Sequence, residues 1–441
     1  MTILKEKIKN YNNINGSKDF YKWVAYILGS IAQLFNLFHR VTTSVLAPYF
    51  LETFKMSNTN LGLMSSIYFY SYAALQPVVG VLTDRWKPRK MLTISVIIIT
   101  LGTLIYAYSP SFIFTYIGRL LIGIGSAGIF VPVSWIITGY FSYDKRGFLF
   151  AILTFFGGIG SVLAASPFAK LITYFGWRNA LTNIAYTSFV LAVLIWLVVR
   201  DDNFNKVNEA NLNNKDKKSV IKTDEEKIIW FAIFKEVVSI PIIKYCFLSM
   251  LNYATMVSFQ GLWAVPFFID IYKMEKSAAS DLVTMIPLGF LVGVLLLSKL
   301  NDTKYGRYIF FFVNAISLIV YLIFTISTIN LPNTFVIILL FLIGFSNSMN
   351  SYLFKLYSLV FPKRYGTALG IVNMSPLILS AIYQSFTGLL FDLPERGVDA
   401  LQRNVGPYKL YFLILTISLV VATLARVEMI KILNKDYKGK I

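Results

Sequence analysis

The chain has very few of the residues from which most catalytic and metal sites are built. Its 441 residues include one cysteine, Cys246, and one histidine, His39. A lone cysteine cannot form a disulfide within the chain, and one cysteine with one histidine cannot surround a metal ion. The sequence also offers no nucleophile–base pair, no phosphate-binding loop and no cluster of metal ligands. It therefore predicts that the protein is not an enzyme and that it holds no metal and no cofactor.

Charged residues are scarce as well. Only 14% of the residues are charged and 56% are hydrophobic, whereas about 25% are charged in an ordinary soluble domain. A water-soluble fold of this length cannot bury so many apolar side chains. The excess of 41 Lys and Arg over 22 Asp and Glu then indicates a membrane protein with basic inner loops. We expect contact with a lipid bilayer and no nucleic-acid partner.

Twelve apolar stretches are each long enough to cross a bilayer as a helix. Their approximate ranges are 23–50, 60–83, 91–109, 112–141, 148–172 and 177–199, then 240–270, 278–299, 307–329, 332–360, 366–391 and 406–427. The polar segment 200–227 separates the two groups of six and predicts a flexible linker, with a short amphipathic helix after it. The predicted fold class is an all-α integral membrane protein with twelve transmembrane helices in two six-helix bundles.

The distribution of basic residues predicts the orientation of these helices. Of the 41 Lys and Arg residues, 28 fall in the segments on one side and about 8 on the other. Since basic loops stay inside the cell, both termini are expected in the cytoplasm, at a plasma or inner membrane. The expected regions are a cytoplasmic tail over 1–22, a first bundle over 23–199, a cytoplasmic linker over 200–239, a second bundle over 240–430 and a cytoplasmic tail over 431–441.

The two groups of helices are related by an internal repeat. A constant shift of 218 residues places APYFLETFKM, 47–56, on VPFFIDIYKM, 265–274. The pairs include Pro48 with Pro266, Glu52 with Asp270, and Lys55 with Lys273. Chance similarity between apolar helices explains shared Leu and Phe, but not proline, acidic and basic positions in one register. We expect two duplicated halves of parallel topology.

One loop links the sequence to a known family. GVLTDRWKPRK, 80–90, resembles the signature loop G-x-L-x-D-R-x-G-R-[RK] of the major facilitator superfamily, with Lys87 in place of the usual glycine. The shift of 218 places a degenerate second copy at 298–307, where that family also has one. With the helix count and the linker, the resemblance covers nearly the whole chain and implies a transporter that works by alternating access. It also implies a conformational gate, for which the alternative is simple anchoring by basic loops; the gate residues would be Gly80, Asp84, Arg85, Arg89, Asp302 and Arg307.

The first apolar stretch carries a polar stripe. Its members are Gln33, Asn36, Arg40 and Thr43, at spacings of 3, 4 and 3, which place them on one helix face. Such a stripe faces protein or a water-filled cavity and not lipid. An arginine near the bilayer centre costs roughly 2.5–3.5 kcal/mol, and Arg119 in the fourth stretch carries a similar penalty. Two cations retained at this cost indicate an anionic cargo; the alternative is that either arginine snorkels or pairs with helix carbonyls.

A closer resemblance concerns the same arginine. R-x7-P-Y-[FL], from Arg40 to Phe50, and D-R-x-x-P-R, from Asp84 to Arg89, are similar to the organophosphate:phosphate antiporters. In that family an arginine of helix 1 and an arginine of helix 7 hold the phosphate, but the repeat shift gives Ser258 at the second position. A site with one arginine favours a carboxylate or another monoanion. The anion:cation symporters, also major facilitators, match equally well.

Other polar residues complete the predicted substrate site. Further candidates for substrate contact, with ordinary helix packing as the alternative, are Ser258, Gln260, Trp263, Asn347 and Asn373. No Asp or Glu lies in the midst of a predicted span, and His39 is expected to be a packed neutral side chain. Exchange against a counter-anion, or co-transport with a proton carried on the substrate, fits this absence.

The sequence thus predicts a monomeric secondary transporter of a small solute, with an organic anion as the expected cargo. Two alternatives stay open. One is a membrane sensor that has the same fold but does not transport, and the other is a transporter of a neutral or zwitterionic solute.

Overall fold

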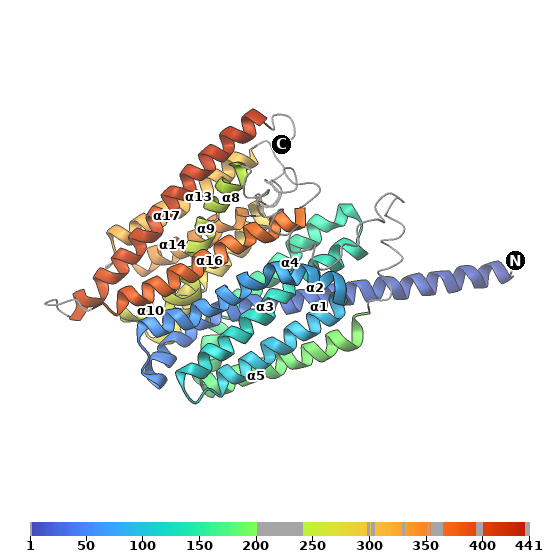
Figure 1. Cartoon of the computed structure of the whole chain (residues 1–441), viewed down its shortest axis with the longest axis horizontal. Coiled ribbons are helices and arrows are strands. Elements are labelled where there is room, and N and C mark those ends of the chain that lie inside the picture. The colour runs from blue at the N-terminus through green and yellow to red at the C-terminus, as the bar shows by residue number, and fades with distance from the viewer. Residues whose placement is uncertain are drawn as a thin grey trace, which may run out of the picture.

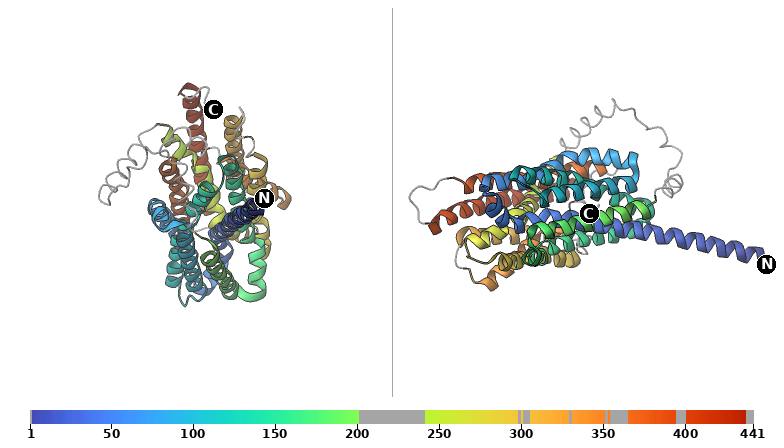
Figure 2. Two further views of the ribbon diagram at one scale, coloured as in Figure 1. Left: turned by 90° about the vertical axis from the view of Figure 1, so that its right-hand side faces the viewer. Right: turned by 90° about the horizontal axis from the view of Figure 1, so that it is seen from below.

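A computed structural model of the chain describes residues 2–200, 241–297, 300, 305–328, 331–350, 353, 365–393 and 400–436. Within these residues the regular structure is helical, and no strand occurs. The helices form one elongated bundle (Figure 1, Figure 2). Apart from residue 200, the predicted linker over 200–239 lies outside the described residues, as do residues 437–441 of the predicted C-terminal tail.

Five long helices make up the first half of the chain. They are α1 (Thr2–Phe54), α2 (Asn58–Ala107), α3 (Phe112–Tyr140), α4 (Tyr143–Leu163) and α5 (Ser166–Val198). Two of them contain a non-helical residue where two predicted spans meet, namely Lys87 in α2 and Gly176 in α5. From Thr2 onward the predicted N-terminal tail continues α1 as a helix, and it extends beyond the bundle (Figure 1).

Shorter helices make up the second half. They are α8 (Pro241–Ser249), α9 (Leu251–Ser258), the π-helix η1 (Phe259–Trp263), α10 (Ala264–Asp270), α11 (Lys276–Val283), α12 (Met285–Leu297), α13 (Gly306–Ile326), α14 (Asn333–Asn347), the 3₁₀ turn η3 (Ser348–Asn350), α16 (Tyr365–Phe391) and α17 (Ala400–Asp436). Where described, the twelve predicted spans fall largely on helical residues; 240, 298–299, 329, 351–352 and 354–360 lie outside the described part. Eight of the described helices are long and apolar enough to cross a membrane.

The backbone repeats itself where the sequence does. Among the described residues three non-glycine residues have positive φ, and two of them are the repeat mates Lys55 (φ 50°) and Lys273 (φ 55°). A positive φ is uncommon without glycine. Each lysine lies shortly after the helix that ends its repeat, α1 or α10. The shared conformation supports the duplication deduced from the shift of 218 residues.

The two halves are joined at the end of the bundle where α1 stops and α2 begins, which we call the distal end. The Asp392 carboxylate accepts hydrogen bonds from the backbone N–H groups of Asn58 (3.0 Å) and Thr59 (2.7 Å). It thereby caps the N-terminus of α2 from the end of α16, in the other half. Burial by itself would raise the pKa of Asp392, but the hydrogen bonds from Thr59 and Asn58 outweigh it and hold that pKa below its usual range.

Further polar contacts cross between the halves at the distal end. Lys276 at the start of α11 forms an ion pair with Glu52 of α1 at 2.6 Å, and the Ser166 hydroxyl donates to Asp281. Together with the Asp392 cap, these contacts involve three different helix pairs. The distal end is therefore closed along its width.

Close backbone contact between α2 and α16 accompanies these polar contacts. A Cβ atom added at Gly62 would lie 2.5 Å from the carbonyl oxygen of Gln384, and one added at Gly388 would collide with the carbonyl oxygen of Asn58. Only glycine permits this approach. The distal seam thus depends on the absence of two side chains.

Candidate binding site between the halves

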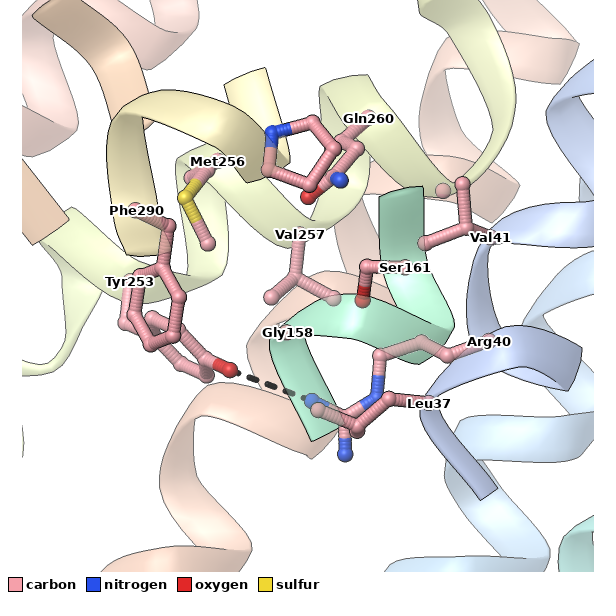
Figure 3. Close-up of a pocket in the computed structure, with 12 residues that line it drawn as sticks. Leu37, Arg40, Val41, Gly158, Ser161, Tyr253, Met256, Val257, Gln260 and Phe290 are labelled. Carbon is pink, nitrogen blue, oxygen red and sulfur yellow. Dashed lines mark hydrogen bonds between the residues drawn. The ribbon is translucent and has the colours of Figure 1, made fainter. Parts of the chain in front are cut away.

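A small cavity lies between the two halves (Figure 3). The first half contributes residues of α1 and α4, and the second contributes residues of α9, η1 and α12. The lining residues are Leu37, Arg40, Val41, Gly158, Ser161, Tyr253, Met256, Val257, Gln260, Gly261, Pro287 and Phe290. The volume of the cavity is about 20 Å³, which is room for one or two water molecules. A solute can occupy this site only after the two halves move apart.

Arg40 is the charged residue of the cavity lining. Its Nη1 donates a hydrogen bond to the Tyr253 hydroxyl at 3.2 Å, across the boundary between α1 and α9 (Figure 3). Its Nε is buried and has no partner. None of the lining residues is a carboxylate, and the ion pairs of the described residues do not include Arg40. A guanidinium charge in an apolar setting without a counter-charge is unfavourable, and a bound anion would compensate it.

Arg119 is fully buried in α3 and does not line the cavity. Its Nη1 donates to the carbonyl oxygen of His39 at 2.6 Å, and its guanidinium lies 4.5 Å from the centroid of the Tyr68 ring. Its Nε and Nη2 have no partner. In this conformation Arg119 therefore makes the contact with a helix carbonyl that the sequence left open as an alternative. Direct contact with a substrate remains a prediction.

The predicted polar stripe of α1 forms a chain of hydrogen bonds with α2. Asn36 donates to Gln33 at 3.1 Å, and the Tyr68 hydroxyl donates to Asn36 at 3.0 Å. Gln33 and Asn36 do not line the cavity in this conformation. Since the Tyr68 ring lies against Arg119 and its phenol also interacts with Arg40, this chain of hydrogen bonds positions a neighbour of both arginines. The stripe thus faces neighbouring helices, as expected from its polarity.

His39 also packs against a neighbouring helix and not into the cavity. It is 1% exposed, and its Nε2 lies 3.4 Å from the Thr103 hydroxyl. It is not among the residues that line the cavity.

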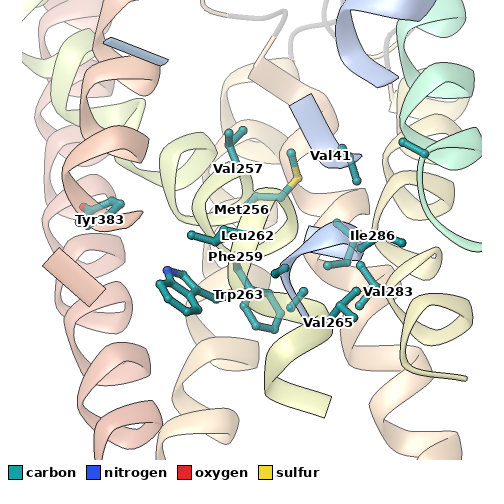
Figure 4. Close-up of a cluster of buried hydrophobic side chains, with 14 of the residues drawn as sticks. Val41, Met256, Val257, Phe259, Leu262, Trp263, Val265, Val283, Ile286 and Tyr383 are labelled. Carbon is teal, nitrogen blue, oxygen red and sulfur yellow. The ribbon is translucent and has the colours of Figure 1, made fainter. Parts of the chain in front are cut away.

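Helix 7 of the sequence prediction is divided in the structure by the π-helix η1. Gln260 of η1 lines the cavity, and its Nε2 has no partner. Ser258, which precedes η1, instead shares a hydrogen bond of 3.1 Å with Tyr411 inside the second half. Trp263 packs edge-on against Phe391 at 4.7 Å within a buried hydrophobic cluster (Figure 4). Of these three candidates, the structure places only Gln260 at the cavity.

The two asparagine candidates also lie away from the cavity lining. Asn347 is fully buried in α14 and donates to the carbonyl oxygen of Ile343 at 2.9 Å. Asn373 is partly buried in α16. Neither is among the lining residues. Their predicted contact with substrate would require another conformation.

Two polar residues of the cavity were missed by the sequence analysis, namely Tyr253 and Ser161. Tyr253, Val257 and Gln260 are spaced by four and three residues, and all three line the cavity. This helical spacing is a signal that would have placed Tyr253 on the same face as Gln260.

A second fully buried arginine, Arg426 of α17, was also missed. It is 0% exposed. Its Nε donates to the Ser249 hydroxyl at 2.9 Å, and its guanidinium lies 3.7 Å from the Phe310 ring centroid. Arg426 therefore joins α17 to α8 and α13 within the second half.

The predicted gate is only partly described. The backbone of Gly80 and Arg85 lies in α2, and Arg89 donates from Nε to the carbonyl oxygen of Trp196 in α5 at 2.8 Å. The side chains of Asp84 and Arg307, and all of Asp302, lie outside the described residues. Lys87, in the position of the family's glycine, has φ 60° and ψ 161°, a conformation that favours glycine.

Known proteins resemble this chain over most of its length. The family model described as "Major Facilitator Superfamily" matches residues 29–426. The uncharacterized transporter YybO of Bacillus subtilis is 27% identical over 276 residues, which are 60% of this chain and 61% of that protein, so the match spans less than two thirds of that relative. The probable sulfoacetate transporter SauU of Cupriavidus necator is 24% identical over 316 residues, 69% of this chain and 68% of that protein.

A solved structure has the same fold. The bacterial homolog of the human lysosomal transporter Spinster, in its inward-facing and unoccupied conformation, superposes with a TM-score of 0.68 at 17% sequence identity. The superposition covers 93% of this chain and 98% of that one. At this identity the likeness concerns the fold alone.

Proposed function

This chain belongs to the Major Facilitator Superfamily, and from that premise we propose that it carries a small organic anion across the membrane by alternating access. Membership makes the protein a multi-pass membrane transporter of a small solute and not an enzyme. The anionic nature of the cargo is our proposal. It rests above all on the Arg40 guanidinium, which lines a cavity between the halves that contains no carboxylate.

The electrostatic setting of Arg40 supports an anion. A cation inside a protein is normally paired with an opposite charge, yet the polar side chains around the partly buried Arg40 are the neutral phenols of Tyr253, Tyr68 and Tyr72, and its Nε has no partner. Arg119 adds a second like charge that interacts with Arg40. Both guanidinium groups would be stabilised by an anion in the cavity. We therefore assign Arg40 as the main anion anchor, with Arg119 acting through space.

The relative named as a probable sulfoacetate transporter supports the same class of cargo, because sulfoacetate is a small organic anion. We keep Gln260 as a substrate contact, since it lines the cavity with an unused amide donor. Gln33 and Asn36 act by positioning Tyr68 in this proposal. Ser258, Trp263, Asn347 and Asn373 are assigned no contact in the closed conformation.

We propose that the termini face the cytoplasm, because the excess of basic residues lies in the segments on their side. The distal end is then the outer end, and its contacts through Asp392, Lys276 and Asp281 close the site from outside. The halves 23–199 and 240–430 would rock against each other around the cavity. The 80–90 loop and its second copy at 298–307 would serve as the cytoplasmic gate.

Coupling follows from the composition of the cavity. No Asp or Glu lines it, so the protein offers no carboxylate there as a proton relay. We propose exchange for a second anion, or entry of a proton on the substrate itself. Vesicles preloaded with an anion should then take up labelled anion faster than empty vesicles, or uptake should follow an imposed pH gradient.

The test of the anion anchor is uptake into vesicles that contain the purified protein. A panel of isethionate, sulfoacetate, a hexuronate and a hexose 6-phosphate covers small and sugar-sized anions. Arg40→Ala should abolish the uptake shown by the unmodified protein while leaving expression and melting temperature unchanged. Lys431→Ala, which removes an exposed cation paired with Glu428, serves as the control. Normal uptake by Arg40→Ala, or no uptake of any anion by the unmodified protein, would refute the proposal.

Vesicle uptake also separates a transporter from a sensor. A sensor of the same fold binds its ligand without accumulating it. Accumulation of label above the amount of protein present establishes transport.

A further inference from the structure

The proposed anion site lacks the second arginine that a symmetric pair of halves would provide. Resting on the proposed function, we infer that Tyr253 is the arm of the anion site contributed by the second half, and that the site selects monoanions over dianions. Arg40 and Tyr253 would then hold one anion from opposite halves.

The geometry places the two groups at the same point of the cavity. The Tyr253 oxygen lies 3.2 Å from Nη1 of Arg40, and the bond joins α9 to α1 (Figure 3). In this bond the phenol oxygen accepts, so its own hydrogen is left to donate. Among the described residues no acceptor for this hydrogen is found. An anion on Arg40 would therefore meet a second donor that is already in place.

The repeat mate of Arg40 cannot fill this role in the same conformation. The hydroxyl of Ser258 is 0% exposed and shares its hydrogen bond with Tyr411, inside the second half. Tyr253 lies five residues earlier, more than one helical turn away. The second half thus contributes a neutral donor, the Tyr253 hydroxyl, and position 253 is not the repeat mate of Arg40.

The charge of the lining determines which anions fit. Arg40 is the one charged residue among those that line the cavity, and Ser161, Tyr253 and Gln260 are neutral donors. Most of the remaining lining is apolar, with Met256 and Phe290 among its larger side chains. A monoanion would neutralise Arg40, the one cation of the lining. The second charge of a dianion would lie against apolar side chains, which is unfavourable, because Arg119 does not line the cavity and bonds the His39 carbonyl instead.

This arrangement also links binding to movement of the halves. In this conformation the Tyr253 phenol is a hydrogen-bonding partner of Arg40 from the other half. An anion that accepts hydrogen bonds from both Arg40 and Tyr253 would replace their direct hydrogen bond. The two halves would then be joined through the anion. The phenol is therefore a positioning residue for Arg40 without substrate, and a substrate contact once the anion is present.

The first experiment removes only the phenol oxygen. Tyr253→Phe should weaken binding of the preferred anion by about tenfold or more, as expected for a hydrogen bond to a charged group. It should raise KM for uptake more than it lowers the maximal rate. Tyr383→Phe is the matched control, because Tyr383 bonds Ser418 on α17 and does not line the cavity. Equal anion affinity in Tyr253→Phe and the unmodified protein would overturn the inference, even if Arg40→Ala abolished uptake.

The second experiment counts charges with matched probes at pH 7.5. Isethionate and sulfoacetate have similar size and carry one and two charges, and a hexuronate and a hexose 6-phosphate form a second such pair. We expect the monoanion of a pair to bind at least tenfold more tightly. Tyr253→Arg, which adds a cation at the same place, should shift the preference toward the dianion. A preference of the unmodified protein for dianions would overturn the inference and leave the proposed function intact, whereas binding of no anion at all would refute the proposed function itself.

Discussion

The two halves of this protein share their helix ends but not their polar chemistry. Lys55 and Lys273 occupy matching positions and have the same unusual backbone conformation. Arg40 and Ser258 also match in sequence, yet the first faces the cavity and the second faces Tyr411 in its own half. Duplication has preserved the way each half turns at the distal end. The binding site arises from residues that differ between the halves.

The matching acidic residues show the same divergence. Glu52 forms an ion pair with Lys276 of the other half, whereas its mate Asp270 accepts a hydrogen bond of 2.9 Å from Tyr408 of its own half. One copy of the carboxylate joins the halves, and the other stabilises a single half. A position kept in sequence can therefore change its mechanical role.

The largest expected effect comes from moving the cation to its repeat position. In the double variant Arg40→Ser with Ser258→Arg, each half receives the residue of the other. Because position 258 faces the second bundle, we expect anion uptake to remain about a hundredfold below the unmodified level, the scale of losing a charged anchor. Uptake into vesicles measures this. Restored uptake would show that the two positions are equivalent after all.

The second prediction separates the two halves at their outer seam. A side chain at Gly62 would collide with the backbone of α16, so Gly62→Leu should prevent outer closure and lower uptake by more than about tenfold. A cysteine introduced in place of Ser385 reports the seam, because the Ser385 hydroxyl lies 2.8 Å from that of Ser66. Its labelling from outside should become faster in Gly62→Leu.

The control for this wedge is Gly147→Leu, since a Cβ at Gly147 meets no described atom within 4 Å. The natural cysteine, Cys246, is buried and gives little background labelling. Unchanged labelling and uptake in Gly62→Leu would mean that α2 and α16 do not form the seam.

The third prediction concerns the cap of α2 by Asp392. Its pKa is lowered when the halves are closed, so the cap contributes to closure above the ordinary carboxyl pKa of about 3.9 and is lost as pH falls through the lowered value. Seam labelling, divided at each pH by the labelling of free cysteine to remove the titration of the thiol itself, should therefore be constant from about pH 5 to 8 and rise only below about pH 4. Asp392→Asn should favour opening by about 1 kcal/mol at neutral pH, the scale of a helix cap. A steep change between pH 6 and 7 would exclude Asp392 as the group responsible.

The smallest effect concerns a loop in which the halves differ. Lys87 has φ 60° and ψ 161°, whereas its repeat mate Tyr305 has φ −91°. A residue with a side chain in the first conformation stores about 1–3 kcal/mol of strain. Lys87→Gly should therefore raise the melting temperature by a few degrees, with a gain of about 1 kcal/mol. Tyr305→Gly should lower it, and the opposite order would show that Lys87 is unstrained.

The fold could be predicted from the sequence because membrane spans depend on length and polarity. Apolar runs, a polar linker and a register shared by charged and proline residues are properties of the chain alone. The spacing of Gln33, Asn36 and Arg40 likewise placed them on one helix face before any neighbour was known. Residues 2–22, predicted only as a tail, are helical.

Parts of the site could not be predicted, because they depend on how helices are rotated against each other. From the sequence alone, Arg119 and Arg426 cannot be distinguished from arginines that bind substrate or lipid. In the structure both are fully buried, donate to backbone carbonyls and lie against aromatic rings. Nothing local in the sequence indicates that Tyr253 reaches across to Arg40. The π-helix η1 directly follows Ser258 and changes which side of the helix the Ser258 side chain lies on, relative to the residues after η1. A prediction from regular α-helical spacing assumes that no π-helix is present, so it places Ser258 on the wrong side.

The π-helix η1 offers an account of how the halves diverged. The ungapped repeat, 47–56 on 265–274, lies after η1, whereas the mate of Arg40 lies before it. A π turn accommodates one additional residue within a helix, and each residue rotates a helix by about 100°. If one residue of η1 is treated as an insertion in the second half, Arg40 aligns with Val257 and not with Ser258. Val257 does line the cavity. A single inserted codon would thus turn one helix face away from the centre of the transporter and bring another in.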